Sequence, residues 1–307
     1  MTNVFIDGSA GTTGLRIADR LAARRDLNLL RLPEDLRKDN SARRDAIHGA
    51  DIVFLCLPDA AAVEAVALAE GSRAKIIDTS TAHRTNPAWA YGFPELTGQR
   101  EKITASSRIA NPGCHASGFV ALVAPLVEQG IVRRDASLTS FSLTGYSGGG
   151  KKMIAEYEST GRSTLLKGPR QYGLTQQHKH LKEMVKICGL DSAPVFCPIV
   201  GDFYSGMEVT VPLFAKDIKG SLDDIRALYR SYYASGLVRF VEEADPDGML
   251  SACGFSGRDD MAVSVFGNDD RIILTSRFDN LGKGASGAAI QNMNILLGVD
   301  EATGLNV

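Results

Sequence analysis

The chain has 307 residues, of which 23% are charged, and a formal net charge of −2. This length leaves room for two domains with sizeable cores, and the charge balance argues against a nucleic-acid-binding protein, whose binding face is usually basic. No apolar stretch approaches the roughly 18 residues needed to span a bilayer, and no basic-then-apolar leader precedes the first strand pattern. The five cysteines lack the spacing of a disulfide framework, as expected of reduced thiols. We therefore expect a cytoplasmic protein that binds small molecules rather than nucleic acid or a membrane.

The N-terminal segment combines a strand pattern, a glycine-rich turn and a helix pattern. Residues 3–7 form a short strand-like run, and Gly8, Gly11 and Gly14 follow it before a helical pattern that extends to about residue 24. Glycines in such a turn let the backbone approach a pyrophosphate, which the amides at the helix N-terminus then bind. The spacing G-x-x-G-x-x-G differs from the G-x-G-x-x-G of the NAD fingerprint, so a purely structural turn is the alternative. The position directly after the first strand favours a nucleotide site.

Strand and helix patterns then alternate, as they do in a doubly wound parallel sheet. Residues 27–32, 51–58 and 75–80 are strand-like, with a helix pattern at 60–70, and 51–58 is a near-continuous apolar run typical of a strand buried on both faces. This alternation predicts a Rossmann-type α/β domain. Residues 33–38, after the second strand, lie where the ribose of a dinucleotide is recognised. They include acidic and basic side chains, so they do not discriminate NAD from NADP.

A polar loop at residues 81–87 follows the third of these strands, at the edge where open α/β sheets bind ligands. Arg84 in this loop has a planar guanidinium that suits a phosphate or a carboxylate. A solvated surface arginine is the alternative interpretation. We predict an anion contact at Arg84.

Residues 109–118, Ile-Ala-Asn-Pro-Gly-Cys-His-Ala-Ser-Gly, place a cysteine at the entrance of a predicted helix. Asn111, Pro112 and Gly113 form a turn, and a largely apolar run of helical length follows. In the first turn of a helix, Cys114 meets unpaired backbone N–H groups and the positive end of the helix dipole, which favour the thiolate and lower its pKa. A thiolate is a nucleophile, so Cys114 is a candidate catalytic residue. The alternative is a small buried residue at a strand-to-helix junction.

From about residue 136 the pattern changes to strands in which apolar and polar residues alternate. We expect these strands at 138–143, 207–213, 261–266 and 271–278, the last two joined in a hairpin around 268–270. Two helices interrupt them, one at 177–187 and one that begins near Ser221 with a spacing close to a capping box. This pattern predicts an α+β domain with a mixed or antiparallel sheet that is open to pairing with a second subunit.

His178 and His180 lie at the start of the first of these helices. Either one, if it faced a cleft, could move protons near neutral pH, and Glu183 lies on the same helix face as His180 and could orient it. A surface position is the alternative for each histidine. On a helix, residues two apart point about 200° away from each other, so we do not expect a shared metal ion.

The last motif is a second glycine-rich turn, at residues 279–287, before an amphipathic helix over 288–297. Such a unit can pack back on the first domain, so that the α+β domain would be an insertion. A plain C-terminal helix preceded by a flexible turn fits the pattern as well. We assign 1–113 to a dinucleotide-binding domain, 114–283 to a catalytic and dimerisation domain, and 284–307 to a returning C-terminal helix.

Taken together, these motifs resemble the N-acetyl-γ-glutamyl-phosphate reductase family of arginine biosynthesis, in its shorter form, within the semialdehyde dehydrogenase superfamily. The resemblance rests on the order and spacing of six segments across nearly the whole chain: 8–14, 78–84, 91–96, 111–114, 178–183 and 280–285. It implies NADPH-dependent reduction of an acyl phosphate to an aldehyde with release of phosphate, in a homodimer or homotetramer. Two departures are Lys182, in place of a common proline, and Ser205-Gly206-Met207, in place of Arg-Gly-Ile in longer members.

The resemblance also implies roles for individual residues. Cys114 matches the nucleophile of the family, and His178 and His180 match its acid/base histidine motif. Independently of the resemblance, we expect substrate contacts at Arg84 and Asn111. The expected contacts to NADP are Gly8, Ser9, Gly11, Thr12, Thr13, Gly14, Asn280, Lys283 and Gly284.

Three other functions are compatible with parts of this pattern. The first is the same chemistry on aspartyl phosphate or another acyl phosphate. The second, from a different class, is a cysteine acyl hydrolase in which Cys114 and a histidine work without a cofactor, although the N-terminal glycine turn disfavours it. The third is a regulatory protein that binds a dinucleotide but has lost catalysis, which the combination of Cys114 and the histidine motif disfavours.

Overall fold

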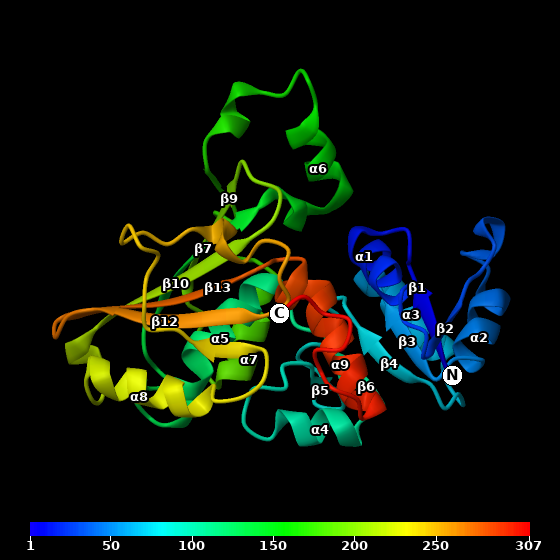
Figure 1. Ribbon diagram of the computed structural model, residues 1–307, viewed down its shortest axis with the longest axis horizontal. Coiled ribbons are helices and arrows are strands. Elements are labelled where there is room, and N and C mark those ends of the chain that lie inside the picture. The colour runs from blue at the N-terminus through cyan, green and yellow to red at the C-terminus, as the bar shows by residue number, and fades with distance from the viewer. The chain divides into compact units, whose positions relative to one another are not determined.

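The computed structural model describes all residues from 1 to 307, and the chain divides into two compact units. Unit 1 comprises residues 1–112 and 285–305, and unit 2 comprises residues 113–284 and 306–307. In Figure 1, the blue, cyan and red ribbons belong to unit 1, and the green to orange ribbons belong to unit 2. Unit 1 is therefore assembled from two separate stretches of sequence.

Unit 1 is built on a six-stranded sheet with the strand order β2-β1-β3-β4-β6-β5, in which every pair is parallel. Its strands are β1 (Thr2–Asp7), β2 (Leu27–Leu30), β3 (Ile52–Leu55), β4 (Lys75–Asp78), β5 (Ala90–Tyr91) and β6 (Arg108–Ala110). Its helices are α1 (Thr12–Leu21), α2 (Asn40–His48), α3 (Asp59–Leu68), α4 (Gln99–Ala105) and α9 (Gly287–Leu297). The arrangement confirms the doubly wound parallel sheet that the alternation of strand and helix patterns predicts.

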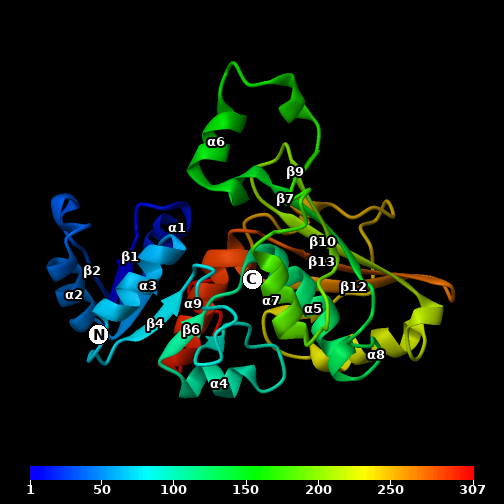
Figure 2. The same ribbon diagram turned by 180° about the vertical axis from the view of Figure 1, so that it is seen from behind.

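Apolar side chains fill both faces of this sheet, because successive residues of a strand point to opposite faces. Val4 and Phe54 belong to a core cluster shared with α1, α4 and α9, whereas Phe5 and Val53 belong to a second cluster shared with α2 and α3. Figure 2 shows these helices around the strands of the sheet. All four residues of β3 are buried, as predicted for a strand that is covered on both sides.

Helix α9 differs from its prediction, because an amphipathic helix was expected and residues 287–296 are all buried. Its polar side chains are hydrogen-bonded inside unit 1 rather than solvated. The Gln291 amide donates to Glu95 and Glu301, and the Asn292 amide donates to the carbonyl of Gly92 at 2.9 Å. From the sequence, such residues resemble a solvent-facing stripe, because their partners lie far away along the chain.

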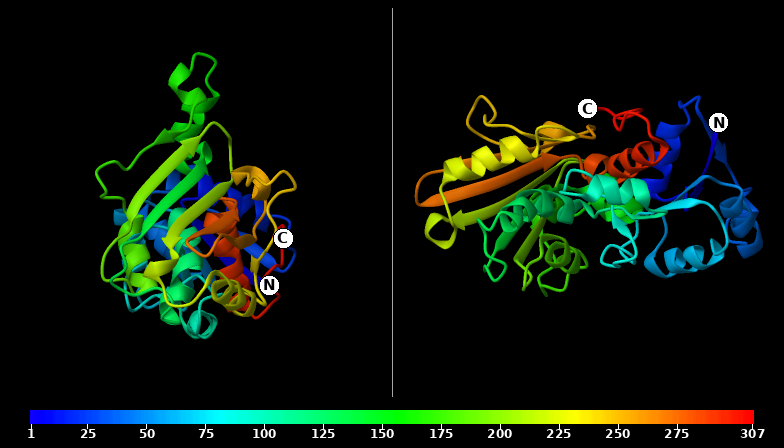
Figure 3. Two further views of the ribbon diagram at one scale, coloured as in Figure 1. Left: turned by 90° about the vertical axis from the view of Figure 1, so that its left-hand side faces the viewer. Right: turned by 90° about the horizontal axis from the view of Figure 1, so that it is seen from below.

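Unit 2 is built on a seven-stranded mixed sheet with the strand order β11-β12-β13-β10-β7-β9-β8. Figure 3 shows strands of this sheet in green to orange. Its strands are β7 (Thr139–Gly145), β8 (Arg170–Gln171), β9 (Val195–Gly201), β10 (Met207–Phe214), β11 (Val238–Phe240), β12 (Met261–Gly267) and β13 (Arg271–Phe278). The predicted hairpin is confirmed, since β12 and β13 pair antiparallel on either side of residues 268–270. The sheet is mixed because β11 pairs parallel with β12, and β7 pairs parallel with β9.

Helices α5 (Cys114–Glu128), α7 (His180–Cys188) and α8 (Leu222–Tyr232) lie along one face of this sheet, and α6 (Gly150–Glu158) lies in an excursion between β7 and β9 (Figure 1). The backbone of α5 approaches the sheet at Gly118, where an added Cβ would lie 2.5 Å from the Val209 side chain. Helix α8 begins with the predicted capping box, formed by Ser221 and Asp224.

Helix α7 begins three residues later than predicted, at His180 instead of Gln177. The reason is a long-range contact of the preceding residue. The side-chain amide of Gln176 accepts a hydrogen bond from the Phe196 N–H at 2.8 Å and donates one to the Phe196 carbonyl at 2.7 Å. These bonds fix the segment before α7 to β9 in a non-helical conformation.

None of the helices combines the length and the apolar character that a membrane span requires.

Candidate active site

Cys114 is the first residue of α5, as predicted from the turn at residues 111–113. The residue before it, Gly113, has no side chain to cap the helix, and its N–H donates to Oε1 of Glu183 at 2.9 Å. Glu183 is 2% exposed and lies in the first turn of α7, so this bond fixes that turn against the start of α5. At this position the positive end of the helix dipole favours the thiolate form of Cys114.

Gly284 lies directly against Cys114. A Cβ added at residue 284 would be 3.0 Å from the Cβ of Cys114, and the N–H of Gly284 donates to the carbonyl of Asp279 at 3.0 Å. The backbone of this glycine-rich segment therefore packs against the candidate nucleophile and leaves little room for a side chain at residue 284.

The two other predicted residues of this segment, Asn280 and Lys283, are buried in unit 2. The Asn280 amide donates to Oγ of Ser147 at 3.0 Å, and its oxygen accepts the N–H of Gly206 at 2.9 Å. These bonds tie the segment to the excursion after β7 and to the residue before β10.

His178 and His180 belong to an aromatic cluster in unit 2, with ring centroids 4.8 Å apart. The expectation that they point away from each other is wrong, because His178 precedes the helix. Its Nδ1 accepts the backbone N–H of His180 at 3.3 Å. Burial, and then the charge of Lys179, lower the pKa of His178, so this imidazole is neutral at neutral pH.

The cluster also contains three residues that the sequence analysis did not select, namely His115, Tyr172 and Phe196. His115 lies 5.7 Å from His178 and 5.6 Å from His180 between ring centroids, and its own contacts include Tyr172 and Phe196. Burial, and then the charges of His178 and Lys179, lower the pKa of His115 to about 3. The only signal in the sequence was that His115 follows Cys114 directly.

In unit 1, the glycine turn after β1 has the shape expected of a pyrophosphate site. Gly8 has a φ of +87°, and an added Cβ would lie 2.3 Å from the carbonyl oxygen of Cys56. A Cβ at Gly14 would lie 2.5 Å from the carbonyl oxygen of Gly8. Gly11 is the N-cap of α1, so that Thr12 and Thr13 form the first turn of that helix, and Ser9 lies within the loop. Only glycine fits at positions 8 and 14 with this backbone.

A buried ion pair fixes the end of β1, immediately before this turn. Nε and Nη2 of Arg43 lie 3.1 and 3.0 Å from Oδ2 of Asp7, and Nη1 reaches Glu64 at 3.0 Å. Burial raises the pKa of Asp7, and the neighbouring guanidinium opposes that rise. The sequence analysis missed Arg43 because an arginine in a polar helix is usually solvated.

Arg84 and Asn111, the two predicted substrate contacts, lie together in unit 1. Nε of Arg84 donates to the carbonyl of Asn111 at 2.9 Å, and its Nη2 donates to the carbonyl of Thr79 at 2.9 Å. Arg84 is 8% exposed, which excludes the alternative of a solvated surface arginine. The Asn111 amide donates to the carbonyl of Ala285 at 3.0 Å.

The loop that carries Arg84 is held by a network around Asp78. Oδ2 of this buried carboxylate lies 2.6 Å from Nδ1 of His83 and accepts the Ser80 hydroxyl at 2.7 Å. The His83 ring stacks on Trp89 with a centroid distance of 4.1 Å. These contacts give the polar loop a defined conformation at the carboxyl end of β4.

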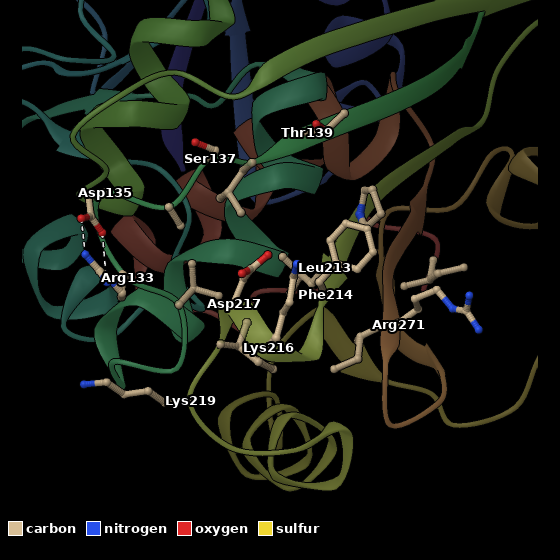
Figure 4. A pocket seen from close by; sticks show the side chains of 17 residues that line it. Arg133, Asp135, Ser137, Thr139, Leu213, Phe214, Lys216, Asp217, Lys219 and Arg271 are labelled. Carbon is tan, nitrogen blue, oxygen red and sulfur yellow. Dashed lines mark hydrogen bonds and ion pairs between the residues drawn. The ribbon is translucent and has the colours of Figure 1, made fainter.

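A cavity of about 960 Å³ lies at one end of the sheet of unit 2 (Figure 4). Its charged lining includes Lys216, Arg271 and the ion pair between Arg133 and Asp135. None of the predicted site residues lines this cavity, so it does not belong to the candidate active site.

Comparison with known proteins gives the family of the chain. The model of the semialdehyde dehydrogenase NAD binding domain matches residues 9–106, and that of the semialdehyde dehydrogenase dimerisation domain matches residues 114–280. N-acetyl-gamma-glutamyl-phosphate reductase 2 of Nostoc sp. is 45% identical, with 98% of each chain covered. N-acetyl-gamma-glutamyl-phosphate reductase of Brucella suis is 46% identical, with 96% of this chain and 98% of the relative covered.

Solved structures with the same fold include aspartate semialdehyde dehydrogenase II of Vibrio cholerae complexed with ASA, with a TM-score of 0.73, 16% identity and coverage of 97% of this chain and 98% of that one. Aspartate semialdehyde dehydrogenase of Candida albicans with NADP has a TM-score of 0.65 and 15% identity, with the same coverage. At these identities the likeness establishes the fold, and the nicotinamide-binding domain is given by the family model. The chain belongs to the N-acetyl-gamma-glutamyl-phosphate reductase family of the semialdehyde dehydrogenases.

Proposed function

We propose that this protein is an NADP-dependent N-acetyl-γ-glutamyl-phosphate reductase of arginine biosynthesis. It would reduce the acyl phosphate to N-acetylglutamate 5-semialdehyde and release phosphate. The observation that carries the proposal is Cys114 as the first residue of α5, in the same unit as the cluster that contains His178 and His180. The names of relatives about 45% identical over nearly the whole chain support the choice of substrate.

Cys114 acts as the nucleophile in this mechanism. Its thiolate attacks the acyl carbon, the amides at the start of α5 stabilise the tetrahedral oxyanion, and the bond to the phosphate oxygen breaks to leave a thioester. When bound, a reduced nicotinamide supplies the hydride that converts the thioester to a thiohemiacetal. Either His178 or His180 first supplies and then removes the proton on the thiohemiacetal oxygen, and Cys114 leaves as a thiolate when the aldehyde forms.

Two segments would hold the cofactor. The turn after β1 fits a pyrophosphate, because a Cβ at Gly8 or Gly14 would fill it, and we assign the contacts there to Gly8, Ser9, Gly11, Thr12, Thr13 and Gly14. Asn280, Lys283 and Gly284 would contact the nicotinamide end, because Gly284 lies against Cys114, where the hydride must arrive.

Arg84 and Asn111 would contact the substrate. The guanidinium of Arg84 is a buried positive charge at the carboxyl end of the parallel sheet, and its hydrogen bonds to two backbone carbonyls fix its orientation. A fixed guanidinium binds a phosphate or a carboxylate with little loss of side-chain entropy.

A coupled spectrophotometric assay tests the proposed function. Oxidation of N-acetylglutamate semialdehyde should require NADP⁺ and inorganic phosphate together, because the reverse reaction consumes both. Preferred turnover of aspartate semialdehyde would support the alternative acyl phosphate instead. Hydrolysis of an acyl phosphate in the absence of any nicotinamide would support the cysteine acyl hydrolase.

The preference for NADP over NAD is assigned to Arg31. This residue directly follows β2, where a doubly wound sheet recognises the ribose, and a basic side chain at this point accommodates the 2′-phosphate of NADP. Arg31 forms no ion pair, whereas Glu34 and Asp35 lie further along in a separate turn over Glu34–Leu36. The sequence analysis did not select Arg31, because it considered only residues 33–38 for ribose recognition.

Replacing Arg31 with alanine should weaken NADPH binding by about ten- to a hundredfold and leave NADH binding nearly unchanged, because a charged hydrogen bond to the 2′-phosphate is lost. Fluorescence titration with each cofactor measures the effect. Arg25→Ala is the matched control, since this arginine is exposed and lies before the other end of β2. An equal loss for both cofactors would contradict the assignment.

The second face of the sheet in unit 2 is proposed as the dimer interface. On this face, opposite α5, α7 and α8, four apolar side chains are exposed by 42–58%: Phe141, Val195, Phe214 and Ile273. The matching family model is a dimerisation domain, and a contiguous exposed apolar patch is typical of a protein interface. We propose that this face pairs with a second copy of the chain, in a homodimer or within a homotetramer.

The substitution Phe141→Asp should raise the dimer dissociation constant by about 30-fold or more, because it places an unpaired charge in the centre of an apolar interface. Sedimentation velocity over a range of concentrations measures this constant. Leu165→Asp is the control, since Leu165 is 73% exposed but lies in the excursion after α6. An unchanged oligomer in the Phe141 variant would rule out this face.

A further inference from the structure

The buried carboxylate of Asp78 forms three hydrogen bonds with the loop that follows it. Asp78 is the last residue of β4 and is 0% exposed. Its Oδ1 accepts the Ser80 N–H at 2.9 Å, and its Oδ2 accepts the Ser80 hydroxyl at 2.7 Å and lies 2.6 Å from Nδ1 of His83. A carboxylate only accepts hydrogen bonds, so Nδ1 of His83 carries a proton in this contact.

The contact with His83 exceeds what a turn after an aspartate needs. Such a turn is closed by one hydrogen bond from the N–H two residues later to the side chain, which here is the bond from Ser80. The second oxygen fixes the ring of His83, which also stacks on Trp89 with an interplanar angle of 13°. Trp89 packs in turn against the core shared with α2 and α3. His83 is therefore held at its edge and on its face, directly before Arg84 in the sequence.

The side chain of Arg84 folds back onto residues beside Asp78. Its guanidinium donates to the carbonyls of Asn111 and Thr79, both at 2.9 Å. Both residues are anchored in the sheet, since the Asn111 N–H donates to the Asp78 carbonyl at 2.8 Å and the Thr79 hydroxyl donates to the Leu55 carbonyl at 2.9 Å. The guanidinium thus has a fixed frame, and the loop after Asp78 must return Arg84 to that frame.

The orientation of Arg84 matters because a guanidinium binds an oxyanion through two parallel N–H groups. A rotation that leaves one of these bonds unmade loses a charged hydrogen bond, which changes affinity by about tenfold or more. The contacts of Asp78 and His83 fix the loop before a ligand binds, so the ordering of the loop does not reduce affinity.

We propose that Asp78, acting through His83, holds the guanidinium of Arg84 in the orientation that binds an oxyanion of the substrate. The oxyanion is the phosphate or the carboxylate, and the experiment below separates the two. Asp78 and His83 are positioning residues, and neither exchanges a proton with the substrate. The inference rests on the proposed function, which places a substrate contact at Arg84.

The variant Asp78→Asn tests the positioning role, because it keeps the size of the side chain and replaces one acceptor oxygen with a donor. Phosphate-dependent oxidation of N-acetylglutamate semialdehyde gives separate KM values for phosphate and for the semialdehyde. One of them should rise about tenfold, with little change in kcat or in the KM for NADP⁺, because only a binding contact is weakened. A rise for phosphate identifies the phosphate as the ligand of Arg84, and a rise for the semialdehyde identifies the carboxylate.

Asp51→Asn is the matched control for this variant. Asp51 is an exposed aspartate that precedes β3, at the opposite end of the parallel sheet, and its side chain accepts the Asn3 N–H at 2.8 Å. The same exchange there should leave both KM values unchanged. Wild-type KM values in Asp78→Asn as well would overturn the inference.

A double variant with Arg84→Gln separates positioning from a general loss of structure. The variant Arg84→Gln should by itself raise the KM that Asp78→Asn raises. Because Asp78 acts through the guanidinium, adding Asp78→Asn to Arg84→Gln should give no further rise. Effects that multiply in the double variant would contradict the proposal.

Two variants of His83 test the residue between Asp78 and Arg84. His83→Leu should reproduce the KM of Asp78→Asn. His83→Asn should restore much of the wild-type value, since the asparagine amide can donate to Asp78 from near the position of Nδ1. Neither replacement has a ring to stack on Trp89, so their difference reports the hydrogen bond. Equal KM values in the two variants would rule out the role of His83.

Nitrogen-15 NMR of the wild-type enzyme gives a readout that does not depend on the substrate. Nδ1 of His83 should stay protonated between about pH 5 and 9, because it donates to a buried carboxylate. A neutral His83 with its proton on Nε2 would overturn the inference. Failure of the proposed function has a different signature, which is a wild-type enzyme that keeps the proton on Nδ1 of His83 but does not oxidise N-acetylglutamate semialdehyde.

Discussion

Replacing Cys114 with serine should reduce turnover by about 10⁴-fold or more, because the hydroxyl of serine does not ionise at neutral pH and no thioester can form. The helix amides that favour a thiolate do not lower the pKa of an alcohol enough to compensate. Phosphate-dependent oxidation of N-acetylglutamate semialdehyde measures the effect. NADPH binding, followed by fluorescence titration, should be nearly unchanged, since the glycine turn after β1 is untouched.

Cys253→Ser provides the matched control for this experiment. Cys253 is exposed and lies in a short helical turn, Ala252–Phe255, so the same exchange of sulfur for oxygen should leave turnover at the wild-type level. Wild-type turnover in the Cys114 variant would contradict the assignment of the nucleophile, and with it the covalent mechanism.

The second large effect is expected at Gly8, where alanine should abolish NADPH binding and destabilise the protein. The residue has a φ of +87°, which costs an alanine about 1–2 kcal/mol, and the added Cβ would lie 2.3 Å from the backbone oxygen of Cys56. Because a backbone atom cannot rotate away, the turn must shift, and the site for the pyrophosphate is lost with it. Fluorescence titration should show binding weakened by at least about a hundredfold, and calorimetry should show a lower Tm.

Gly71→Ala separates backbone strain from the clash. Gly71 also has a positive φ, of +77°, but an added Cβ there would have no atom within 4 Å, and the residue follows α3 rather than β1. This variant should lose about 1 kcal/mol of stability and bind NADPH normally. Equal NADPH affinities in the Gly8 and Gly71 variants would show that the turn after β1 does not bind the cofactor.

Local sequence patterns predicted the fold class of both units but not every element, since the strands β8, β9 and β11 of unit 2 were not predicted. The apolar run over 51–58 indicates a strand covered on both faces, and the structure has β3 there with every residue buried. The period-two alternation over 207–213 indicates a strand with one apolar face, and the structure buries Met207, Val209, Val211 and Leu213. These patterns succeed because burial on one or both faces of a strand leaves a direct mark on the order of its residues.

The site could be predicted only where one short segment builds it. Cys114 was found because its turn and its helix are contiguous in sequence. The hydrogen bonds of His115 to Ser142 and Tyr172 were missed because they join three elements, and no spacing along the sequence encodes their contact. The predicted orientation of His178 was wrong for a similar reason. The hydrogen bonds between Gln176 and Phe196 hold the preceding segment in a non-helical conformation, so α7 begins after His178.

The division of unit 1 between two stretches of sequence has a consequence for its synthesis. Helix α9 contributes Ala289, Ile290 and Met293 to the core on one face of the parallel sheet, and it leaves the ribosome after all of residues 113–284. The synthesis of residues 113–284 takes roughly 10 to 35 s at ordinary elongation rates. The usual order, in which the N-terminal domain folds first, is therefore reversed: unit 2 can complete its sheet while the nascent N-terminal strands wait, partly uncovered and open to chaperones or to aggregation.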